Sequence, residues 1–111
     1  MVEKSFKVMI SQPIAGKTED EIFTAREKAR RYINSKGYNF INTLFIDDRY
    51  KFENMTNEGI INFPLYYFAN SIMNMCKCNI VYFCKGWEDA RGCRLEHEIA
   101  EAYGLKIIYE E

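Results

Sequence analysis

The segment from Gly86 to Glu96 concentrates the side chains that could do chemistry. Trp87 lies in a loop bounded by glycines, which suits stacking on a nucleobase as well as hydrophobic anchoring. If a helix begins near Gly92 or Cys93, Glu96 lies in its first turn, where the helix dipole keeps a carboxylate ionised. An acid in a first turn can also be merely stabilising, so spacing alone leaves both interpretations open. The remaining candidates in this segment are Glu88, Asp89 and Arg91.

A second loop, from Ser11 to Lys17, is similar to part of a phosphate-binding loop. It ends in Gly-Lys-Thr, but Ser11 stands where that motif opens with glycine, and Pro13 removes one backbone N–H. A nucleoside triphosphatase loop is therefore disfavoured, and an ordinary strand-to-helix connection is the alternative. A loop that opens a helix after a parallel strand nevertheless points free N–H groups at an anion.

The elements that must position these loops alternate between strand and helix. Thr18 and Glu21 predict a capping box at the start of the first helix, which Lys36 and Gly37 end. Residues 43–59 predict a loop that can hold one short helix. Apolar runs and helical spacing predict strands over residues 6–10, 38–42, 80–84 and 105–109, and further helices over 65–75 and 93–103.

The last helix is expected to present one apolar face to the core. Leu95, Ile99 and Ala102 are predicted to point inward, which displaces Glu96 toward the edge that faces the site. His97 is predicted to lie at the surface. In the helix over residues 65–75, the apolar face is expected to hold Leu65, Phe68, Ile72 and Met75.

Strands separated by helices imply parallel pairing through right-handed crossovers. We expect an α/β fold, a three-layer sandwich with a short parallel sheet of about four strands, in a Rossmann- or flavodoxin-like arrangement. Residues 1–111 form one domain, because a second core would leave each half too small. The strand over residues 80–84 is the most apolar and is expected to be central. Both candidate loops then leave the carboxyl ends of strands, where ligands bind in such sheets.

Composition narrows the function classes. Fifteen basic and sixteen acidic side chains give a net charge of −1, which argues against binding a nucleic-acid polymer. The apolar runs are strand-sized, so no membrane partner is expected, and the absence of a signal peptide predicts a cytoplasmic location. The four cysteines favour reduced, mostly buried thiols; zinc binding is the less favoured alternative. We therefore predict no metal and no cofactor.

Two strings carry a family resemblance. Val8 to Thr18 and Gly86 to Ala100 together resemble the small phage- and bacteria-associated branch of the nucleoside 2-deoxyribosyltransferase-like superfamily. Characterised members share the pattern Gly-x-x-x-Glu-x-x-x-Ala, which here falls on Gly92, Glu96 and Ala100. The resemblance implies that Glu96 attacks the anomeric carbon of a nucleoside sugar and displaces the base. A covalent glycosyl-enzyme would then pass its sugar to water or to a second base.

The resemblance also implies how the rest of the site is built. The first loop would line the sugar or phosphate side, and the enzymes it resembles form homo-oligomers whose sites borrow residues from a neighbour. A large aromatic content for so small a core likewise indicates a homo-oligomer. The predicted binding residues are Ser11, Gln12, Pro13, Gly16, Lys17, Gly86, Trp87, Arg91 and Gly92.

Two positions depart from the family pattern. The superfamily commonly has an aspartate at the start of the central strand, where this chain has Asn79, and another on the preceding helix, where it has Ser71. A retaining glycosidase needs a second carboxyl about 5 Å from the nucleophile as proton donor. Asp89 and Glu88 are the candidates for that role.

The sequence therefore supports two main hypotheses. One is an N-glycosidase or deoxyribosyltransferase that acts on a nucleoside or nucleoside monophosphate. The other is a binding module that retained the pocket, lost the chemistry, and sequesters or senses a nucleotide-derived ligand. A purely structural role is the third alternative, because fold does not fix function.

Overall fold

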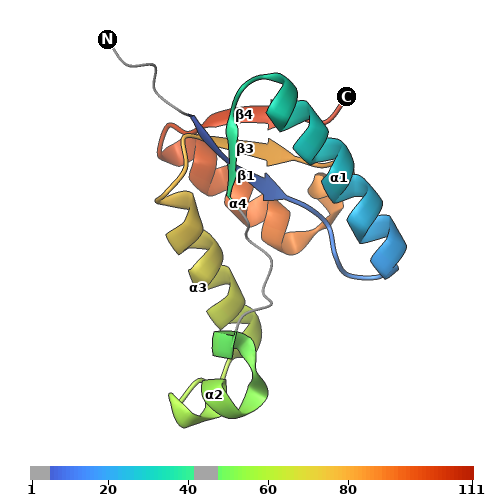
Figure 1. Cartoon of the computed structure of the whole chain (residues 1–111). Helices are drawn as coiled ribbons and strands as arrows, with labels where there is room; N and C mark the ends of the chain where they lie inside the picture. The colour runs from blue at the N-terminus through green and yellow to red at the C-terminus, as the bar shows by residue number, and fades with distance from the viewer. Residues whose placement is uncertain (1–5, 42–47) are drawn as a thin grey trace.

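The computed structural model describes residues 6–41 and 48–111, arranged as one parallel sheet with helices on both faces (Figure 1). Among these residues, none of the helices has both the length and the apolar character needed to cross a membrane. In chain order the elements are β1 (Lys7–Ser11), α1 (Glu19–Ser35), β2 (Asn39–Ile41), the 3₁₀ helix η1 (Asp48–Tyr50), α2 (Phe52–Asn57), α3 (Phe63–Met75), β3 (Ile80–Phe83), the 3₁₀ helix η2 (Trp87–Asp89), α4 (Arg91–Ala102) and β4 (Lys106–Tyr109).

The sheet has the strand order β2-β1-β3-β4, and every pairing is parallel. The α/β prediction is confirmed, and the strand over residues 80–84 is central together with β1. The chain moves from β1 to one edge of the sheet and from β3 to the other. Strand order therefore reverses between β1 and β3, whose last residues, Ser11 and Phe83, are paired. This reversal marks the usual ligand position of open parallel sheets.

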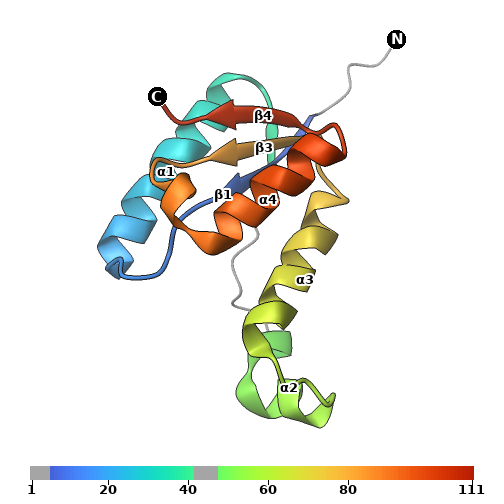
Figure 2. The same ribbon diagram turned by 180° about the vertical axis from the view of Figure 1, so that it is seen from behind.

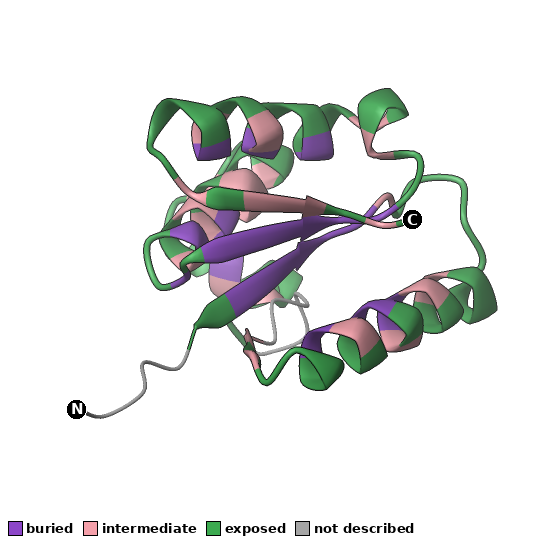
Figure 3. Ribbon diagram, turned by 90° about the horizontal axis from the view of Figure 1, so that it is seen from above, coloured by how far each residue is buried: buried purple, intermediate pink, exposed green. Residues whose placement is uncertain are grey.

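The two faces of the sheet have separate cores. Val8, Ile10 and Tyr82 pack with α1, whereas Met9 and Phe83 belong to the opposite core, to which α3 and α4 contribute. Figure 3 shows the buried stripes of the helices turned toward the sheet between them. Because both faces are covered, the central strands are continuously apolar rather than alternating.

The predicted capping box begins α1. The Thr18 hydroxyl accepts a hydrogen bond from the Glu21 backbone N–H at 3.1 Å, and the Glu21 carboxylate accepts one from the Thr18 N–H at 2.9 Å. Such a cap stabilises a helix by about 1 kcal/mol. The cap fixes where the loop after β1 ends, and so it fixes the position of Lys17.

Helix α3 starts earlier than predicted, at Phe63, and runs from beyond the sheet toward it. Asn62 caps it by accepting a hydrogen bond from the Leu65 N–H at 3.0 Å, and Pro64 fits the first turn. Toward its first residue α3 diverges from α4, and with α2 it forms a projecting arm, residues 52–75 (Figures 1 and 2). Leu65, which the sequence placed on the apolar face of this helix, lies on the arm and is 59% exposed. Of the stretch predicted as a loop, residues 48–59 form η1, α2 and a turn, and 43–47 lie outside the described residues.

Helix α4 also begins earlier than predicted, at Arg91, and this changes its inward face. Its buried residues are Cys93, Glu96 and Ala100, whereas Leu95 is 40% exposed and Ala102 is exposed. The prediction that Leu95 and Ala102 point inward is wrong, because the helix turns Cys93, Glu96 and Ala100 inward instead, and Ala100 shares a core with Val81 and Phe83 of β3. Glu96 is consequently turned toward the sheet, in the second helical turn.

Candidate active site

A buried hydrogen bond joins the two predicted loops. The Ser11 hydroxyl, at the end of β1, donates to Glu96 Oε1 on α4 at 2.6 Å. Ser11 is buried and Glu96 is only 8% exposed. Ser71 of α3 is buried beside them, and its hydroxyl also hydrogen-bonds the Glu96 carboxyl. Three elements that are distant in sequence thus meet at one carboxyl. It lies where strand order reverses, on the face of the sheet that α3 and α4 cover.

The electrostatics of Glu96 differ from the sequence-based expectation. Burial raises the pKa of its carboxyl, while the hydrogen bonds from Ser11 and Ser71 lower it, and the net shift is upward. Burial thus acts against the predicted effect of the helix dipole, since it favours the neutral carboxyl. The dipole acts mainly on the first turn, which Glu96 does not occupy, and removal from water dominates.

Cys93 is the neighbour of this carboxyl on α4. Burial raises the pKa of its thiol to about 11, although a hydrogen bond with Ser11 lowers it in part. Cys93 is therefore a neutral thiol at physiological pH and packs as a small apolar side chain. Cys78 and Cys84 are also buried, as the sequence predicted for most of the thiols, while Cys76 is exposed. Within residues 6–41 and 48–111, no three His, Cys, Asp or Glu side chains form a group that could hold a metal ion.

A groove lies between the diverging ends of α3 and α4, next to the helical turn that precedes Glu96. We call it the α3–α4 groove, and its volume of about 450 Å³ lies within the range of small-molecule sites. Its residues Gly92 and Phe68 precede Glu96 and Ser71 by about one helical turn, so the groove borders the site without including the carboxyl itself. A Cβ atom on Gly92 would meet nothing within 4 Å. The groove is lined by Asn62, Pro64, Leu65, Phe68, Arg91, Gly92 and Leu95.

The first predicted loop divides between the two faces of the sheet. Ser11 faces Glu96, but Gln12 faces α1, where its side-chain amide donates to the Ile22 carbonyl at 2.8 Å and accepts from Arg26 at 2.9 Å. Pro13 and Lys17 line a second groove of about 450 Å³ beside α1. Gly16 is exposed, with a φ of 78° that favours glycine. The structure therefore brings only Ser11 of this loop to Glu96.

Trp87 belongs to an aromatic cluster at the end of β3. Its ring stacks on His97 with centroids 4.2 Å apart and lies 5.7 Å from that of Tyr109. His97 Nε2 is also 2.6 Å from the Tyr109 hydroxyl, and its side chain is 12% exposed. The prediction that His97 lies at the surface is wrong, because Trp87 and Tyr109 cover it. The parallel pairing of β3 with β4 could have indicated this contact, since it places residues 87 and 109 at the same edge.

The other charged candidates lie at the surface. Gly86, with a φ of 90°, turns the chain after β3 and faces Pro13 of the first loop. Glu88 and Asp89 follow in η2, and both are exposed, unlike Glu96. Glu88 contributes its backbone carbonyl to a hydrogen bond from Arg94 at 3.1 Å. The role of either carboxylate as proton donor stays a prediction.

The two departures from the family pattern have different structural meanings. Asn79 lies at the amino end of β3, where its side-chain oxygen accepts from the Lys7 N–H at 2.8 Å. It therefore ties β3 to β1 at the edge of the sheet opposite Ser11. Ser71, in contrast, lies at the site itself and supplies a hydroxyl to Glu96.

The comparisons with known proteins identify a family without a described reaction. A family model described as Domain of unknown function (DUF4406) matches residues 6–109. No curated protein and no solved structure matches the chain significantly. The matched range includes Ser11, Ser71 and Glu96 and every residue that lines the α3–α4 groove.

Proposed function

The chain belongs to the DUF4406 family, and we propose that it binds a nucleoside or nucleoside monophosphate and cleaves its N-glycosidic bond with Glu96 as nucleophile. The observation that carries this proposal is the buried hydrogen bond between Ser11 and Glu96 at the reversal point of the sheet. A carboxyl is costly to bury unless its oxygens are hydrogen-bonded. Here a buried carboxyl has two hydroxyl partners, and the helical turn before it lines an open groove, which favours a chemical role.

The proposed reaction balances with water alone. The Glu96 carboxylate attacks C1′ of the sugar, the C1′–N bond breaks, and its electron pair leaves with the base, which takes up a proton. Water then attacks C1′, releases the sugar and restores the carboxylate. A second base in place of water would complete a deoxyribosyl transfer. Ser11 and Ser71 would hold the carboxyl in one orientation throughout.

The α3–α4 groove supplies binding groups for the rest of the ligand. Arg91 at its rim offers a guanidinium to a phosphate, and the absent side chain of Gly92 leaves space for the sugar. We assign proton donation to the base to Asp89 or Glu88. The proposal agrees with the resemblance to the phage- and bacteria-associated branch of the nucleoside 2-deoxyribosyltransferase-like superfamily, and with a cytoplasmic protein that needs no cofactor.

One observation favours a second candidate function, a binding module without chemistry. Burial raises the pKa of Glu96, and a protonated carboxyl donates a hydrogen bond instead of attacking carbon. In that case Glu96 would recognise a ligand oxygen or nitrogen, and the chain would sequester or sense a nucleotide-derived molecule.

A base-release assay separates the two candidates. The full chain is incubated with the four deoxynucleosides and their 5′-monophosphates, and free base is measured by chromatography. Release that is lost in Glu96→Gln but kept in the matched control Glu98→Gln, an exposed position on the same helix, supports the enzyme. Ligand-induced thermal stabilisation without release identifies the binding module. If neither release nor stabilisation occurs with any of the eight compounds, both candidates are rejected.

A further inference from the structure

A second groove lies beside α1, on the face of the sheet opposite Glu96. We call it the α1 groove; it has a volume of about 450 Å³ and opens at the carboxyl ends of β1 and β3. Its charged side chains are Lys17, Asp20, Glu21, Lys28, Lys85 and Glu110. Neither the proposed reaction nor its nucleophile uses this groove.

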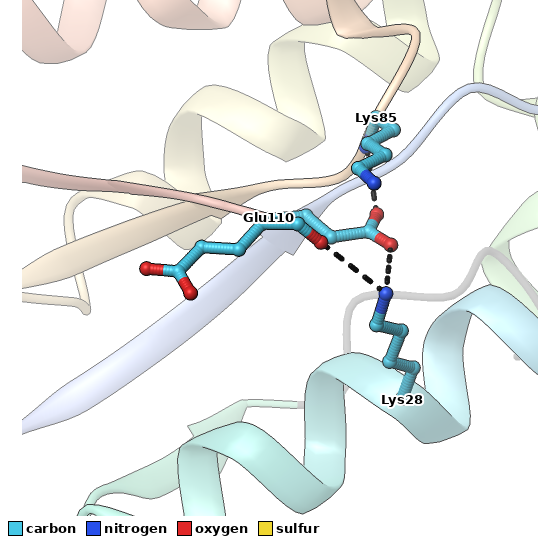
Figure 4. Close-up of polar contacts among 4 residues, drawn as sticks. Lys28, Lys85 and Glu110 are labelled. Atoms are coloured by element: carbon cyan, nitrogen blue, oxygen red, sulfur yellow. Dashed lines mark hydrogen bonds and ion pairs between the residues drawn. The ribbon is translucent and has the colours of Figure 1, made fainter.

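The carboxylate of Glu110, just after β4, is held in the α1 groove. It accepts a hydrogen bond from the Lys85 backbone N–H at 2.8 Å and pairs with Lys28 Nζ at 2.9 Å (Figure 4). Its side chain is only 10% exposed. Burial alone would raise the pKa of this carboxyl, but the Lys85 N–H and Lys28 hold it below its ordinary value. Glu110 is therefore a nearly buried anion with two donors.

The position of this anion is that of a ligand in folds of this kind. The Glu110 N–H donates to the Phe83 carbonyl at 2.9 Å, and the Cys84 N–H donates to the Ser11 carbonyl at 3.0 Å. Glu110 thus follows β4 at the carboxyl edge of the sheet, and its side chain lines the α1 groove together with Gln12 and Cys84, which directly follow β1 and β3. Open parallel sheets bind ligands at that edge.

We propose that the α1 groove binds a phosphate monoester, and that the Glu110 carboxylate occupies the phosphate position when no ligand is bound. The donors that hold the carboxylate, a backbone N–H and a lysine ammonium, are those that hold phosphate oxygens in proteins. With Glu110 displaced, the groove would present three lysines against Asp20 and Glu21. Glu21 is already bound in the capping box of α1, so it would not replace Glu110.

The proposal makes the apparent affinity depend on Glu110. For a ligand that binds only when the carboxylate has moved away, the apparent affinity is the intrinsic affinity multiplied by the fraction of time that the position is free. If the carboxylate occupies the position for about nine-tenths of the time, Glu110→Gln tightens binding by about tenfold. The matched control is Glu111→Gln, since Glu111 contacts Lys28 only through its backbone carbonyl.

Calorimetry with the full chain tests this directly, with thymidine 5′-monophosphate, inorganic phosphate and thymidine as ligands. The expected result is that both phosphate compounds bind, thymidine binds at least tenfold more weakly than its monophosphate, and Glu110→Gln gains about tenfold. Lys28→Gln should lose most of the binding. A Glu110→Gln variant with unchanged phosphate affinity and a lower melting temperature would overturn the proposal and identify the contact as a structural clamp. Absence of phosphate binding to every variant would overturn it equally.

Two further measurements keep the test separate from folding and from the proposed reaction. If Glu110→Gln does not fold, the proposal is tested instead by the NMR signal of the Lys85 backbone amide in the unchanged chain. It must shift on addition of phosphate, because that N–H would exchange its carboxylate partner for the ligand.

The calorimetry is also repeated in Glu96→Gln, where phosphate affinity in the α1 groove should be unchanged. Loss of binding in Glu96→Gln would assign the phosphate to the α3–α4 groove and contradict the second site.

Discussion

At the scale of single residues, Glu96 combines burial with hydrogen bonding in a way that makes its charge depend on pH. Its hydroxyl partners, Ser11 and Ser71, favour the carboxylate, and the surrounding apolar core disfavours it. The raised pKa shows that removal from water is the larger effect. Stability and any catalytic activity should therefore respond in opposite directions as Glu96 loses its proton.

The first prediction concerns the pH dependence of stability. The ordinary pKa of the Glu96 carboxyl is 4.5, and folding raises it. As pH rises above 4.5, the unfolded chain loses this proton before the folded chain does. The free energy of unfolding should then fall relative to Glu96→Gln by about 1.4 kcal/mol per pH unit, until the raised pKa is passed.

Urea denaturation at a series of pH values from 4 to 8 measures this difference. The glutamine variant has no proton to lose at position 96, so it isolates the contribution of the carboxyl. Glu98→Gln, at an exposed position on the same helix, serves as the control and should follow the unchanged chain. Parallel profiles for the unchanged chain and Glu96→Gln would contradict a raised pKa.

The second prediction concerns the hydroxyl of Ser11. Ser11→Ala removes a donor at 2.6 Å from a buried carboxyl, which should cost about 1–3 kcal/mol of stability at pH 8 and less at pH 4. The loss depends on pH because a protonated carboxyl needs fewer donors. Ser35→Ala, whose hydroxyl is exposed and bonds to the Tyr32 carbonyl, should show a smaller, pH-independent change. Equal losses of stability in the two variants would mean that the Ser11–Glu96 hydrogen bond contributes no more than an exposed one.

At the scale of elements, helix α4 shows why the site could be only partly predicted. The sequence identified Glu96 and the strands that flank it, but it placed the start of α4 at Gly92 or Cys93. Ala90 caps the helix without a side-chain hydrogen bond, so no capping residue marked the true start at Arg91. An error of one or two residues was enough to move Glu96 from the second turn to the first, where the helix dipole would lower its pKa.

The contact between α3 and Glu96 lay beyond the sequence for a different reason. Ser71 reaches the carboxyl because of the angle at which α3 passes α4, and helical spacing within one helix does not determine that angle. The cap at Asn62 followed by Pro64 was a usable signal for the start of α3, but the apolar spacing from Leu65 onward outweighed it.

The third prediction uses the open space at Gly92. Gly92→Leu should leave the free energy of unfolding unchanged or raise it by up to about 1 kcal/mol, because leucine favours a helix more than glycine does. The new side chain would fill the α3–α4 groove beside the site, so base release or ligand binding should fall about tenfold or more. Gly104→Leu is not a suitable comparison, since Gly104 has a φ of 75°. Glu98→Leu provides the control on the exposed side of α4. Normal binding by a folded Gly92→Leu variant would place the ligand elsewhere.

At the scale of the whole molecule, the fold of a single chain does not explain the exposed apolar surface of the arm, residues 52–75. The arm projects beyond the sheet (Figure 2). It also exposes apolar side chains that a second copy could cover, in keeping with the homo-oligomer expected from the sequence. The largest of these exposures on and beside the arm are at Phe52, Ile61, Leu65 and Met73.

The fourth prediction follows from this arm. Light scattering should show a multiple of the 13.2 kDa chain, and Leu65→Glu should shift it to the monomer, because a charge cannot be buried in an apolar interface without a partner. The melting temperature of the unchanged chain should rise with protein concentration, and that of the variant should not. Tyr103→Glu, at an exposed aromatic away from the arm, is the control. If the unchanged chain is monomeric at all concentrations, the homo-oligomer is rejected.

The order of strands and helices was predictable because each element carries its own apolar spacing. The α/β class, the parallel sheet and the capping box of α1 all followed from local patterns. The division of the first loop between two faces did not. It depends on the alternation of Ser11 and Gln12 across the sheet, which becomes meaningful only when the helix covering each face is known.

The stack of Trp87 on His97 also gives the molecule a spectroscopic signal of its own. The chain has a single tryptophan, and its ring lies 4.2 Å from the imidazole and at the end of β3. Its tryptophan fluorescence therefore comes from one place, beside Gly86 at the carboxyl edge of the sheet. Unfolding, or movement of η2 when a ligand arrives, would separate the two rings and change the emission without any added label.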